Sequence, residues 1–438
     1  MHSEKTGPSW FRTVAAALAV CALGAIGTPS FAAVKPGEFV TPDNASKVQD
    51  LVSPGVYYKV THGMTMKIVP TERVDWPPPY KDATEKYSAQ VRLSQDKRSV
   101  VGYVAGQPFP LIDANDPDVA NKIVWNNVFR PITTDDYDLR FYDCDSSYER
   151  KGAQQQQIEY FQIGHYMGYD LVGRTEVEPT PIDPDFKTTG RYWLFGLYPI
   201  LAPNEIRGSG FIRWRYADPK RGDDIWSLAG GSRRVRRVDE SIMSSSTTTN
   251  GTSAHAWDPD HYSGFNPKTE QYYYKFLGER NMLATIHALH SPEVRCPTDG
   301  GTSACPEAWE MRHMYVIEAT PDRKRVNALD SKTIVYMDGE MWFEPYIDTY
   351  DQSGTLFRSH IYWLATRDRP VADAKVAIYP FKRSFVVGAV STDVQSGLAT
   401  MCYLPGMETP ERECWYINMG AVDRTSFTTD AMVRAASF

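Results

Sequence analysis

Four arginines within five residues form the most distinctive chemical pattern of this chain: Arg233, Arg234, Arg236 and Arg237. Guanidinium groups bind carboxylates and phosphates through paired hydrogen bonds. On a strand, Arg234 and Arg236 point to one side, so this pair could hold an anionic head group or dock a partner protein. The alternative is a solvated strand whose charges are balanced by Asp223, Asp224, Asp239 and Glu240.

Two carboxylates and a tryptophan form a second candidate site. Glu340 and Glu344 share one face of an expected strand, with Trp342 between them in the sequence. Paired carboxylates are the groups that hydrolyse glycosidic bonds, and a tryptophan beside them would suit a sugar. This pattern keeps a carbohydrate-active enzyme as one hypothesis. The alternative is a set of solvated charges at a sheet edge.

Histidines supply two possible metal groups. His287 and His290 have helical spacing and could bind zinc together with His313, and a loop carries His255, Asp258, Asp260 and His261. Ordinary surface or packing histidines are the alternative for both. The chain has no nucleophile elbow, phosphate loop, zinc-protease motif or dinucleotide fingerprint. We therefore expect a protein that is not an enzyme, without catalytic residues, metal or cofactor.

The cysteines predict two short disulfide loops. Cys296 lies close to Cys305 in the sequence, and Cys402 lies close to Cys414, so in an oxidising compartment these pairs are expected to form disulfides. Zinc binding by the four is the alternative, although their spacing differs from the usual two-residue knuckles. Cys144 is left as a buried free thiol.

Residues 1–32 have the features of a cleaved signal peptide. Lys5 and Arg12 precede the short apolar run 14–26, and Ser30-Phe31-Ala32 provides a small–x–small cleavage pattern. The formal net charge of the whole chain is -7. A negative chain is unsuited to nucleic acid as a partner. We expect a mature protein in the periplasm, either soluble or peripherally associated with the outer membrane.

Strands dominate the expected secondary structure. Asp116-Pro117 predicts the start of a helix that ends near Phe129, and Asn266-Pro267 predicts a second helix that ends at Gly278. Aromatic and β-branched runs separated by turn residues predict the strands. The expected strands cover residues 158–166, 169–177, 191–201, 206–216, 225–228, 233–238, 311–319, 332–337, 341–350, 355–364, 376–381 and 385–392.

These strands follow one another without the helical crossovers that a parallel sheet needs. The sequence therefore predicts a mainly β (α+β) fold with one large, curved antiparallel sheet and a few helices against it. No repeat or clean linker divides residues 33–438, so we expect one mature domain. Its first part, residues 33–110, is rich in proline and glycine and is expected to be irregular and to pack on the sheet.

Several motifs resemble a large proteobacterial family of exported proteins of unknown function. They include Gly210-Phe-Ile-Arg-Trp-Arg-Tyr-Ala-Asp-Pro, the arginine run, Ile334-Val-Tyr-Met-Asp338, Tyr350-Asp-Gln-Ser-Gly354 and Val104-Ala-Gly-Gln-Pro-Phe-Pro-Leu-Ile-Asp113. Members are often described as outer-membrane lipoprotein-sorting proteins, because they resemble the periplasmic carrier and the outer-membrane receptor of the Lol pathway. The resemblance implies an unclosed β-barrel whose hollow is lined with apolar side chains and plugged by helices.

The resemblance also implies a function in transport of hydrophobic compounds. We expect a periplasmic binding or carrier protein for a lipid, a lipoprotein acyl chain or another apolar compound, with an efflux-type inner-membrane transporter and an outer-membrane protein as possible partners. An accessory subunit of a transporter, without a ligand of its own, is the alternative. The residues expected around the hollow are Trp193, Phe195, Phe211, Trp214, Trp226, Tyr273 and Phe276, with Arg234 and Arg236 at a head group or partner.

Overall fold

One large sheet, built mainly from long antiparallel hairpins, dominates the fold. The computed structural model describes residues 34–152, 157–239, 264–289, 295–326, 328–369, 378–403 and 415–437. The main strands follow the spatial order β11 (Tyr272–Ala284), β12 (Glu307–Pro321), β13 (Lys332–Asp338), β14 (Tyr346–Tyr350), β15 (Leu356–Arg367), β16 (Arg383–Asp393), β17 (Leu398–Tyr403), β5 (Asp136–Tyr148), β6 (Tyr160–Asp170), β7 (Arg191–Ala202), β8 (Gly210–Tyr216), β9 (Asp224–Ala229) and β10 (Arg234–Val238).

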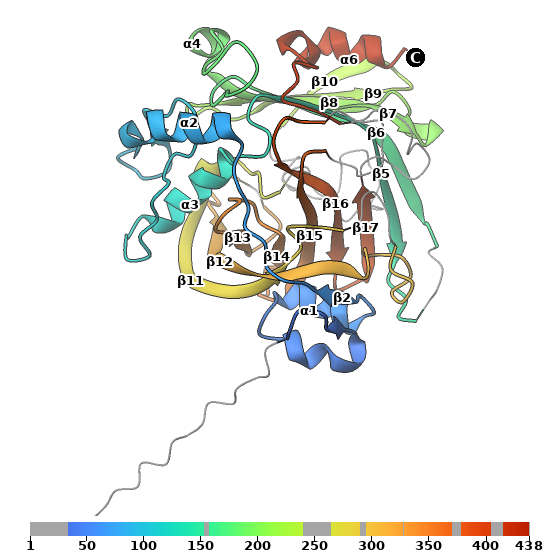
Figure 1. Ribbon diagram of the computed structural model, residues 1–438. Coiled ribbons are helices and arrows are strands. Elements are labelled where there is room, and N and C mark those ends of the chain that lie inside the picture. The colour runs from blue at the N-terminus through green and yellow to red at the C-terminus, as the bar shows by residue number, and fades with distance from the viewer. Residues whose placement is uncertain are drawn as a thin grey trace, which may run out of the picture. The chain divides into compact units, whose positions relative to one another are not determined.

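The main sheet bends back over itself without closing. Strands β6–β10 cross one side of it and β11–β15 the other, while β5 runs between the two sides (Figure 1). Among the described strands, no pairing joins β10 to β11, so the barrel stays open. The predicted fold class is confirmed. A short parallel pairing between β2 (Met66–Ile68) and β12 makes the sheet mixed.

Four small strands complete the described β-structure. β1 (Phe39–Val40) pairs with β2, and β18 (Trp415–Ile417) pairs with the beginning of β5. β3 (Arg92–Leu93) and β4 (Val100–Val101) form a separate ribbon. β18 places Trp415 opposite Leu139 and Ile417 opposite Tyr137 of β5.

The helices are few and short. The α-helices are α1 (Pro54–Thr61), α2 (Pro78–Tyr87), α3 (Val119–Val128), α4 (Asp185–Thr189) and α6 (Thr429–Ala435), and the 3₁₀ turns are η1 (Pro42–Val48), η2 (Ser88–Gln90), η3 (Asn204–Ile206), η4 (Thr269–Gln271) and η5 (Arg424–Phe427). Helix α1 packs against β14 and β15, and α6 packs across β7, β8 and β9. No helix within the described ranges is both long and apolar enough to cross a membrane.

Strand alternation divides the apolar side chains between two cores. On β7, Trp193, Phe195 and Leu197 face the large core inside the bend, whereas Leu194 and Tyr198 face a smaller core beneath α6. The smaller core includes Phe427 and Met432 from the C-terminal segment. Strand β7 is therefore buried on both faces, which explains why its sequence is almost continuously apolar and aromatic.

The helix predicted from Asn266 to Gly278 is wrong. Only the turn η4 is helical there, and the rest is the start of strand β11. Tyr272, Tyr274 and Phe276 alternate along the strand and pack against the large core, as a period of two requires. Gly278 does not end a helix. It lies at a β-bulge with a φ of 117°, a left-handed conformation that favours glycine.

Other expected boundaries also shift. Residues 169–177 do not form a strand of their own, because β6 ends at Asp170 and a loop fixed by buried Arg174 follows. The expected strand 341–350 begins only at Tyr346. Helix α3 begins after Asp118 rather than at Asp116-Pro117, and its end is as predicted. The candidate metal group His255, Asp258, Asp260 and His261 lies outside the described residues.

The structure confirms one predicted disulfide and corrects the other. Cys296 is bonded to Cys305 as expected. Cys402 is bonded to Cys144 instead of Cys414, because β17 and β5 are neighbours and their register sets these two residues directly opposite each other. Cys144 is therefore not a free thiol. Sequence proximity could not find this pair, which is separated by 258 residues.

Candidate functional site: an aromatic cavity beneath helix α3

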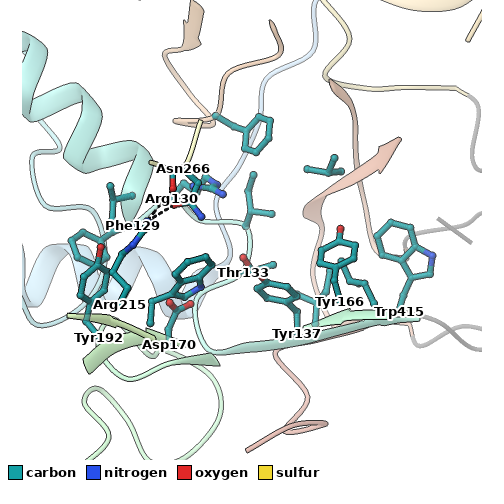
Figure 2. Close-up of a pocket in the computed structure, with 17 residues that line it drawn as sticks. Phe129, Arg130, Thr133, Tyr137, Tyr166, Asp170, Tyr192, Arg215, Asn266 and Trp415 are labelled. Carbon is teal, nitrogen blue, oxygen red and sulfur yellow. Dashed lines mark hydrogen bonds between the residues drawn. The ribbon is translucent and has the colours of Figure 1, made fainter. Parts of the chain in front are cut away.

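A cavity of about 70 Å³ lies inside the bend of the sheet, below the C-terminal end of α3 (Figure 2). Strands β5, β6, β7 and β8 supply one wall, and residues of β16, β18 and two loops supply the other. Its lining combines many apolar side chains with a few polar ones: Val128, Phe129, Arg130, Ile132, Thr133, Tyr137, Leu139, Tyr166, Asp170, Tyr192, Trp193, Arg215, Asn266, Phe343, Val386, Trp415 and Ile417.

Seven of these residues are aromatic, and strand register positions their rings. Tyr137 lies opposite Gly168 on β6, and a Cβ atom at that glycine would lie 2.3 Å from the tyrosine ring. The glycine therefore lets the Tyr137 ring lie across the strand and reach Tyr166, with ring centroids 6.0 Å apart. On β7, Trp193 packs at 5.3 Å from Phe195, so the wall continues into the core.

Helix α3 and the residues after it form the roof. The helix buries Val119, Ile123 and Val124 at helical spacing. At its end, Asn127 donates from its side-chain amide to Glu344 Oε2 at 2.6 Å and to the Trp342 carbonyl at 2.9 Å. These contacts attach the roof to the loop 341–345, far away in sequence.

Glu344 is the buried acid of this roof. Its side chain accepts hydrogen bonds from the Phe265 backbone N–H and from Asn127. Burial raises the pKa of Glu344 to about 7, and the nearby Arg130 guanidinium and these hydrogen bonds only partly offset it. The residue is therefore poised to change charge near neutral pH.

Arg130 and Arg215 bring guanidinium groups to the cavity (Figure 2). Arg130 donates from Nη1 to the Asn127 carbonyl at 2.9 Å and lies 5.2 Å from the centre of the Phe343 ring. Arg215 donates from Nε to Asp223 Oδ2 at 2.9 Å and from Nη1 to the Asn266 carbonyl at 3.0 Å. Protein groups thus hold both side chains in fixed orientations before any ligand binds.

Asp170 contributes the single carboxyl group of the described lining. It is the last residue of β6, and its backbone N–H donates to the Asp135 carbonyl while its own carbonyl accepts from Arg174. Within the described ranges, no hydrogen bond or ion pair engages its carboxyl oxygens. Burial raises the pKa of Asp170 well above its usual value, although Arg174 and Arg130 act in the opposite direction.

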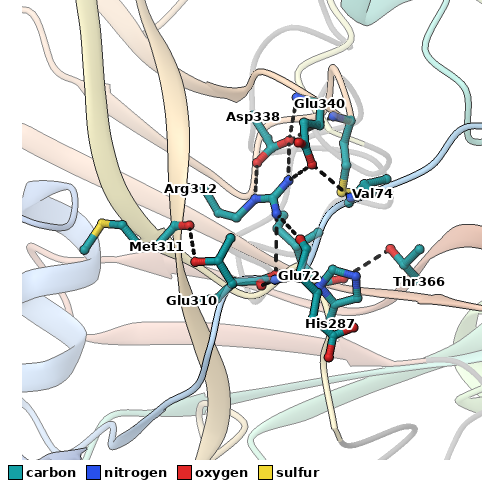
Figure 3. Close-up of polar contacts among 12 residues, drawn as sticks. Glu72, Val74, His287, Glu310, Met311, Arg312, Asp338, Glu340 and Thr366 are labelled. Carbon is teal, nitrogen blue, oxygen red and sulfur yellow. Dashed lines mark hydrogen bonds and ion pairs between the residues drawn. The ribbon is translucent and has the colours of Figure 1, made fainter. Parts of the chain in front are cut away.

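A second polar group, the Arg312 cluster, lies away from this cavity and consists of Glu310, Arg312, Asp338, Glu340 and His287 (Figure 3). Arg312 donates to Asp338 at 2.7 Å and to Glu340 at 2.8 Å. His287 Nδ1 lies 2.7 Å from Glu310. Backbone groups of Glu72 and Val74 also bond to this cluster, so it ties the N-terminal segment to β12 and β13.

A family model described as a protein of unknown function, DUF1329, matches residues 39–433, which is nearly all of the chain. The chain belongs to DUF1329. The resemblance noted from the sequence motifs is thereby confirmed. An uncharacterized protein from Pseudomonas aeruginosa is 20% identical to this DUF1329 chain over 378 residues, covering 82% of this chain and 77% of the relative.

Solved structures with similar folds include a DUF1329 protein from Desulfovibrio piger, with a TM-score of 0.40, 14% identity, and coverage of 68% of this chain and 92% of that one. A domain from Vibrio parahaemolyticus described as a candidate outer-membrane lipoprotein-sorting protein has a TM-score of 0.45, 15% identity, and coverage of 72% and 97%. A LolA superfamily protein from Nitrosomonas europaea has a TM-score of 0.36, 12% identity, and coverage of 68% and 92%.

The residues expected around one hollow are divided in this DUF1329 chain. Trp193 lines the cavity, and Phe195 and Phe211 lie on the same face but are buried in the core behind it. Trp214 and Trp226 lie on the opposite face, where their rings pack 4.4 Å apart beneath α6. The strand pleat causes this separation, because neighbouring residues along β7–β9 point to opposite faces of the sheet.

The remaining expected residues lie at the two sheet edges. Arg234 and Arg236 are exposed on β10 and do not line the cavity. Tyr273 is on β11 rather than a helix; it is 55% exposed and packs against Arg98 and Asp322. Phe276 is half-buried near Tyr315.

The expected carboxylate and histidine groups do not assemble in this DUF1329 chain. Glu344 is fully buried in the roof, whereas Glu340 belongs to the Arg312 cluster, so they share no strand face with Trp342. His313 pairs with Glu279, apart from His287. His290 is outside the described residues. Within the described ranges, no three His, Cys, Asp or Glu side chains form a metal-binding group.

Most of the actual lining was missed from the sequence. Tyr137 and Leu139 belong to the run Asp135-Asp-Tyr-Asp-Leu-Arg-Phe-Tyr-Asp-Cys-Asp145, which alternates acidic and apolar residues. That alternation is the signal of a half-buried strand and could have identified β5. Arg130, Asp170 and Trp415 carried no such signal, because their approach depends on pairings between distant segments.

Proposed function

We propose that this DUF1329 protein binds a hydrophobic ligand in the cavity beneath α3 and serves as a carrier or binding protein in the bacterial envelope. The observation that carries the proposal is the composition of the cavity wall. Seven aromatic and five aliphatic side chains surround five polar ones inside the bend of the sheet. Small-molecule sites typically combine such an apolar lining with a few fixed polar groups.

The size of the cavity sets a condition on this function. Its volume of about 70 Å³ is well below the roughly 300–1,000 Å³ of sites for drug-sized ligands. A larger ligand must therefore displace the roof, and the polar contacts of Asn127 and Glu344 must change as it enters. Each methylene group that the ligand buries contributes about 0.8 kcal/mol. A short apolar chain can therefore offset the free energy that is needed to displace the roof.

Two features support the location in the envelope. The two disulfides, Cys144–Cys402 and Cys296–Cys305, suit an oxidising compartment. The signal-peptide pattern of residues 1–32 predicts export to such a compartment.

A substitution that fills the cavity tests the proposal. Val386→Phe places a ring in the space at the β16 wall, and we expect it to weaken binding of the fluorescent apolar probe N-phenyl-1-naphthylamine by about 10-fold or more, because ligand and ring compete for one volume. The measurement is a fluorescence titration of the mature protein, with thermal unfolding followed in parallel.

The matched control is Val235→Phe on β10. This valine packs beneath α6 on the other face of the sheet, so the same change should leave probe binding unaltered. Equal binding by wild type and Val386→Phe would place the ligand elsewhere. Failure of the wild type to bind any apolar probe, together with no co-purified lipid in native mass spectrometry, would favour an accessory subunit without a ligand.

A further inference from the structure

The Glu344 carboxyl group joins segments of the roof that lie far apart in the sequence. Its Oε2 atom accepts a hydrogen bond from the Asn127 side chain at 2.6 Å, and its Oε1 atom accepts one from the Phe265 backbone N–H. Asn127 belongs to the end of α3, Phe265 to the segment before β11, and Glu344 to the loop 341–345. Three parts of the chain therefore meet at one carboxyl group.

Each of these three residues is adjacent in sequence to a residue that lines the cavity. The neighbours are Val128, Asn266 and Phe343. The cavity wall and the contacts of Glu344 are thus coupled through the backbone. A movement that separates this carboxyl group from its two donors also moves the lining.

The carboxyl group is closely packed and shielded from water. Glu344 is fully buried, with an exposed fraction of 0%. Gly264 passes so close that a Cβ atom there would lie 2.2 Å from Glu344 Oε1, and its φ of 91° also favours glycine. Opening the roof at this point would break both hydrogen bonds and bring water to the carboxyl group.

We propose that Glu344 is the latch of the cavity: its two hydrogen bonds hold the roof closed, and a ligand larger than the empty cavity enters when Asn127 and Phe265 separate from its carboxyl group. This inference rests on the proposed function, since it specifies how the same cavity admits its ligand. The latch is open in the bound protein, so ligand binding must supply the free energy that opens it. A weaker latch should therefore increase the affinity for the ligand.

The charge of Glu344 makes the latch depend on pH. Burial raises the pKa of Glu344 to about 7, and hydration in the open roof would return it towards its ordinary value of 4.5. The open form therefore holds fewer protons than the closed form between these values. A rise in pH through this range favours opening.

Other charged groups near the latch do not reverse this direction. Arg130, which follows α3, favours the ionised form of Glu344, but burial outweighs it. Asn266, next to the backbone donor, accepts a hydrogen bond from Arg215 at 3.0 Å. Asp170 at the end of β6 lines the same cavity and has its pKa raised by burial. A test of the pH dependence must therefore separate Glu344 from Asp170.

Asn127→Ala and Asn126→Ala form a matched pair that tests the latch. Both asparagines are buried at the end of α3, but Asn126 bonds to the backbone of Phe109, outside the cavity lining. On the mature protein at pH 7, Asn127→Ala should bind N-phenyl-1-naphthylamine about 5-fold more tightly than the wild type, because it loses a hydrogen bond that only the closed roof makes. Asn126→Ala should bind the probe as the wild type does.

A gain in affinity distinguishes a latch from a residue that merely supports the fold. Unchanged or weaker binding by Asn127→Ala, or an equal gain in Asn126→Ala, would overturn the proposal. Adding Val386→Phe to Asn127→Ala should remove the gain, since the ring occupies the cavity. A gain that persists in the double variant would place the probe elsewhere and would also overturn the proposal.

Glu344→Gln provides the readout that depends on pH, because an amide does not ionise. Between pH 6 and 8, the wild-type affinity for the uncharged probe should increase about 10-fold relative to that of Glu344→Gln. Asp170 is present in both proteins, so its contribution cancels. Equal pH profiles would overturn the assignment of the latch to this carboxyl group, and this comparison alone decides if Asn127→Ala does not fold. Absence of any probe binding by the wild type would instead overturn the proposed function, and this inference with it.

Discussion

The Arg312 cluster and the cavity beneath α3 both bury charged side chains, but they compensate these charges differently. In the Arg312 cluster, all three guanidinium nitrogens donate: Nε to Asp338 at 2.7 Å, Nη1 to the Glu72 carbonyl at 2.6 Å and Nη2 to Glu340 at 2.8 Å (Figure 3). The other oxygen of Asp338 accepts the backbone N–H groups of Glu340 and Met341. Every partner is a protein group.

The cavity presents the opposite case. Asp170 has a raised pKa and no hydrogen bond or ion pair to its carboxyl oxygens from the described residues, although its backbone neighbour Asp135 accepts three backbone N–H groups. Buried polar groups in native proteins are usually satisfied. A fully paired buried charge therefore indicates a structural role, and an unpaired acid beside an empty space indicates a place for a ligand.

The largest effect should come from breaking the structural cluster. Arg312→Met leaves Asp338 and Glu310 buried without their counterion, and removing one partner of a buried ion pair costs about 3–5 kcal/mol of unfolding free energy. Chemical denaturation of the wild type and the variant measures the loss. Probe affinity of the folded fraction should not change, since Arg312 is remote from the cavity lining.

Arg312→Lys is the companion variant. A lysine keeps the charge but cannot bind Asp338 and Glu340 through a planar fork, so its stability should fall between those of the wild type and Arg312→Met. A stability loss below about 1 kcal/mol in Arg312→Met, well under the usual cost of breaking a buried pair, would show that the cluster does not hold the N-terminal segment in place. The Arg312 cluster would then lack the structural role that distinguishes it from the cavity beneath α3.

A medium effect should come from the roof, where Glu344 is hydrogen-bonded yet has a pKa of about 7. Its folded-state pKa is above the unfolded value, so the folded protein binds the extra proton between these values and stability falls as the pH rises from about 4.5 to 7. Glu344→Gln imitates the protonated form. As the pH rises from about 4.5 to 8, the unfolding free energy of the wild type should therefore fall relative to that of the variant by on the order of 3 kcal/mol.

The comparison of two proteins at each pH is essential here. Burial lowers the pKa of His165 to about 4, so this residue destabilises the fold as the pH falls below about 6.5, opposite to Glu344. Asp136 and Asp348, each with a pKa raised to about 6 by burial, act in the same direction as Glu344. Subtracting the variant from the wild type cancels these contributions. A difference that does not depend on pH would show that Glu344 is ionised throughout.

The fold was predictable from the sequence where patterns are local. The β7 and β13 runs, their turns and the antiparallel arrangement follow from aromatic and β-branched alternation, whereas the unclosed barrel was implied by the family resemblance. The approach failed where tertiary contacts decide. Asn266-Pro267 and Gly278 are typical start and stop signals of a helix, yet pairing along the whole of β11 with β12 makes residues 272–284 a strand. Cys402 likewise finds its partner through strand register rather than proximity in sequence.

The candidate site was less predictable than the fold. Trp193 and Trp214 are equally aromatic, and only the pleat and the position of α6 send one to the cavity and the other to the opposite core. Arg130 and Asp170 are ordinary residues in the sequence. Their importance comes from the bend of the sheet, which brings the end of α3 over the end of β6. No local pattern encodes such a contact.

The smallest effect should come from the exposed arginines, which belong to neither region. Arg234 lies exposed on edge strand β10 and has no place in the cavity lining. Arg234→Glu should change the unfolding free energy by no more than about 0.5 kcal/mol, because solvent screens surface charges, and it should leave probe affinity within about two-fold of wild type. Loss of transport activity in cells, with stability and probe affinity unchanged, would indicate that the arginine run contacts a partner protein. A weakened probe affinity would instead extend the ligand site from the cavity to the sheet edge at β10, and the exposed arginines would then belong to the ligand site.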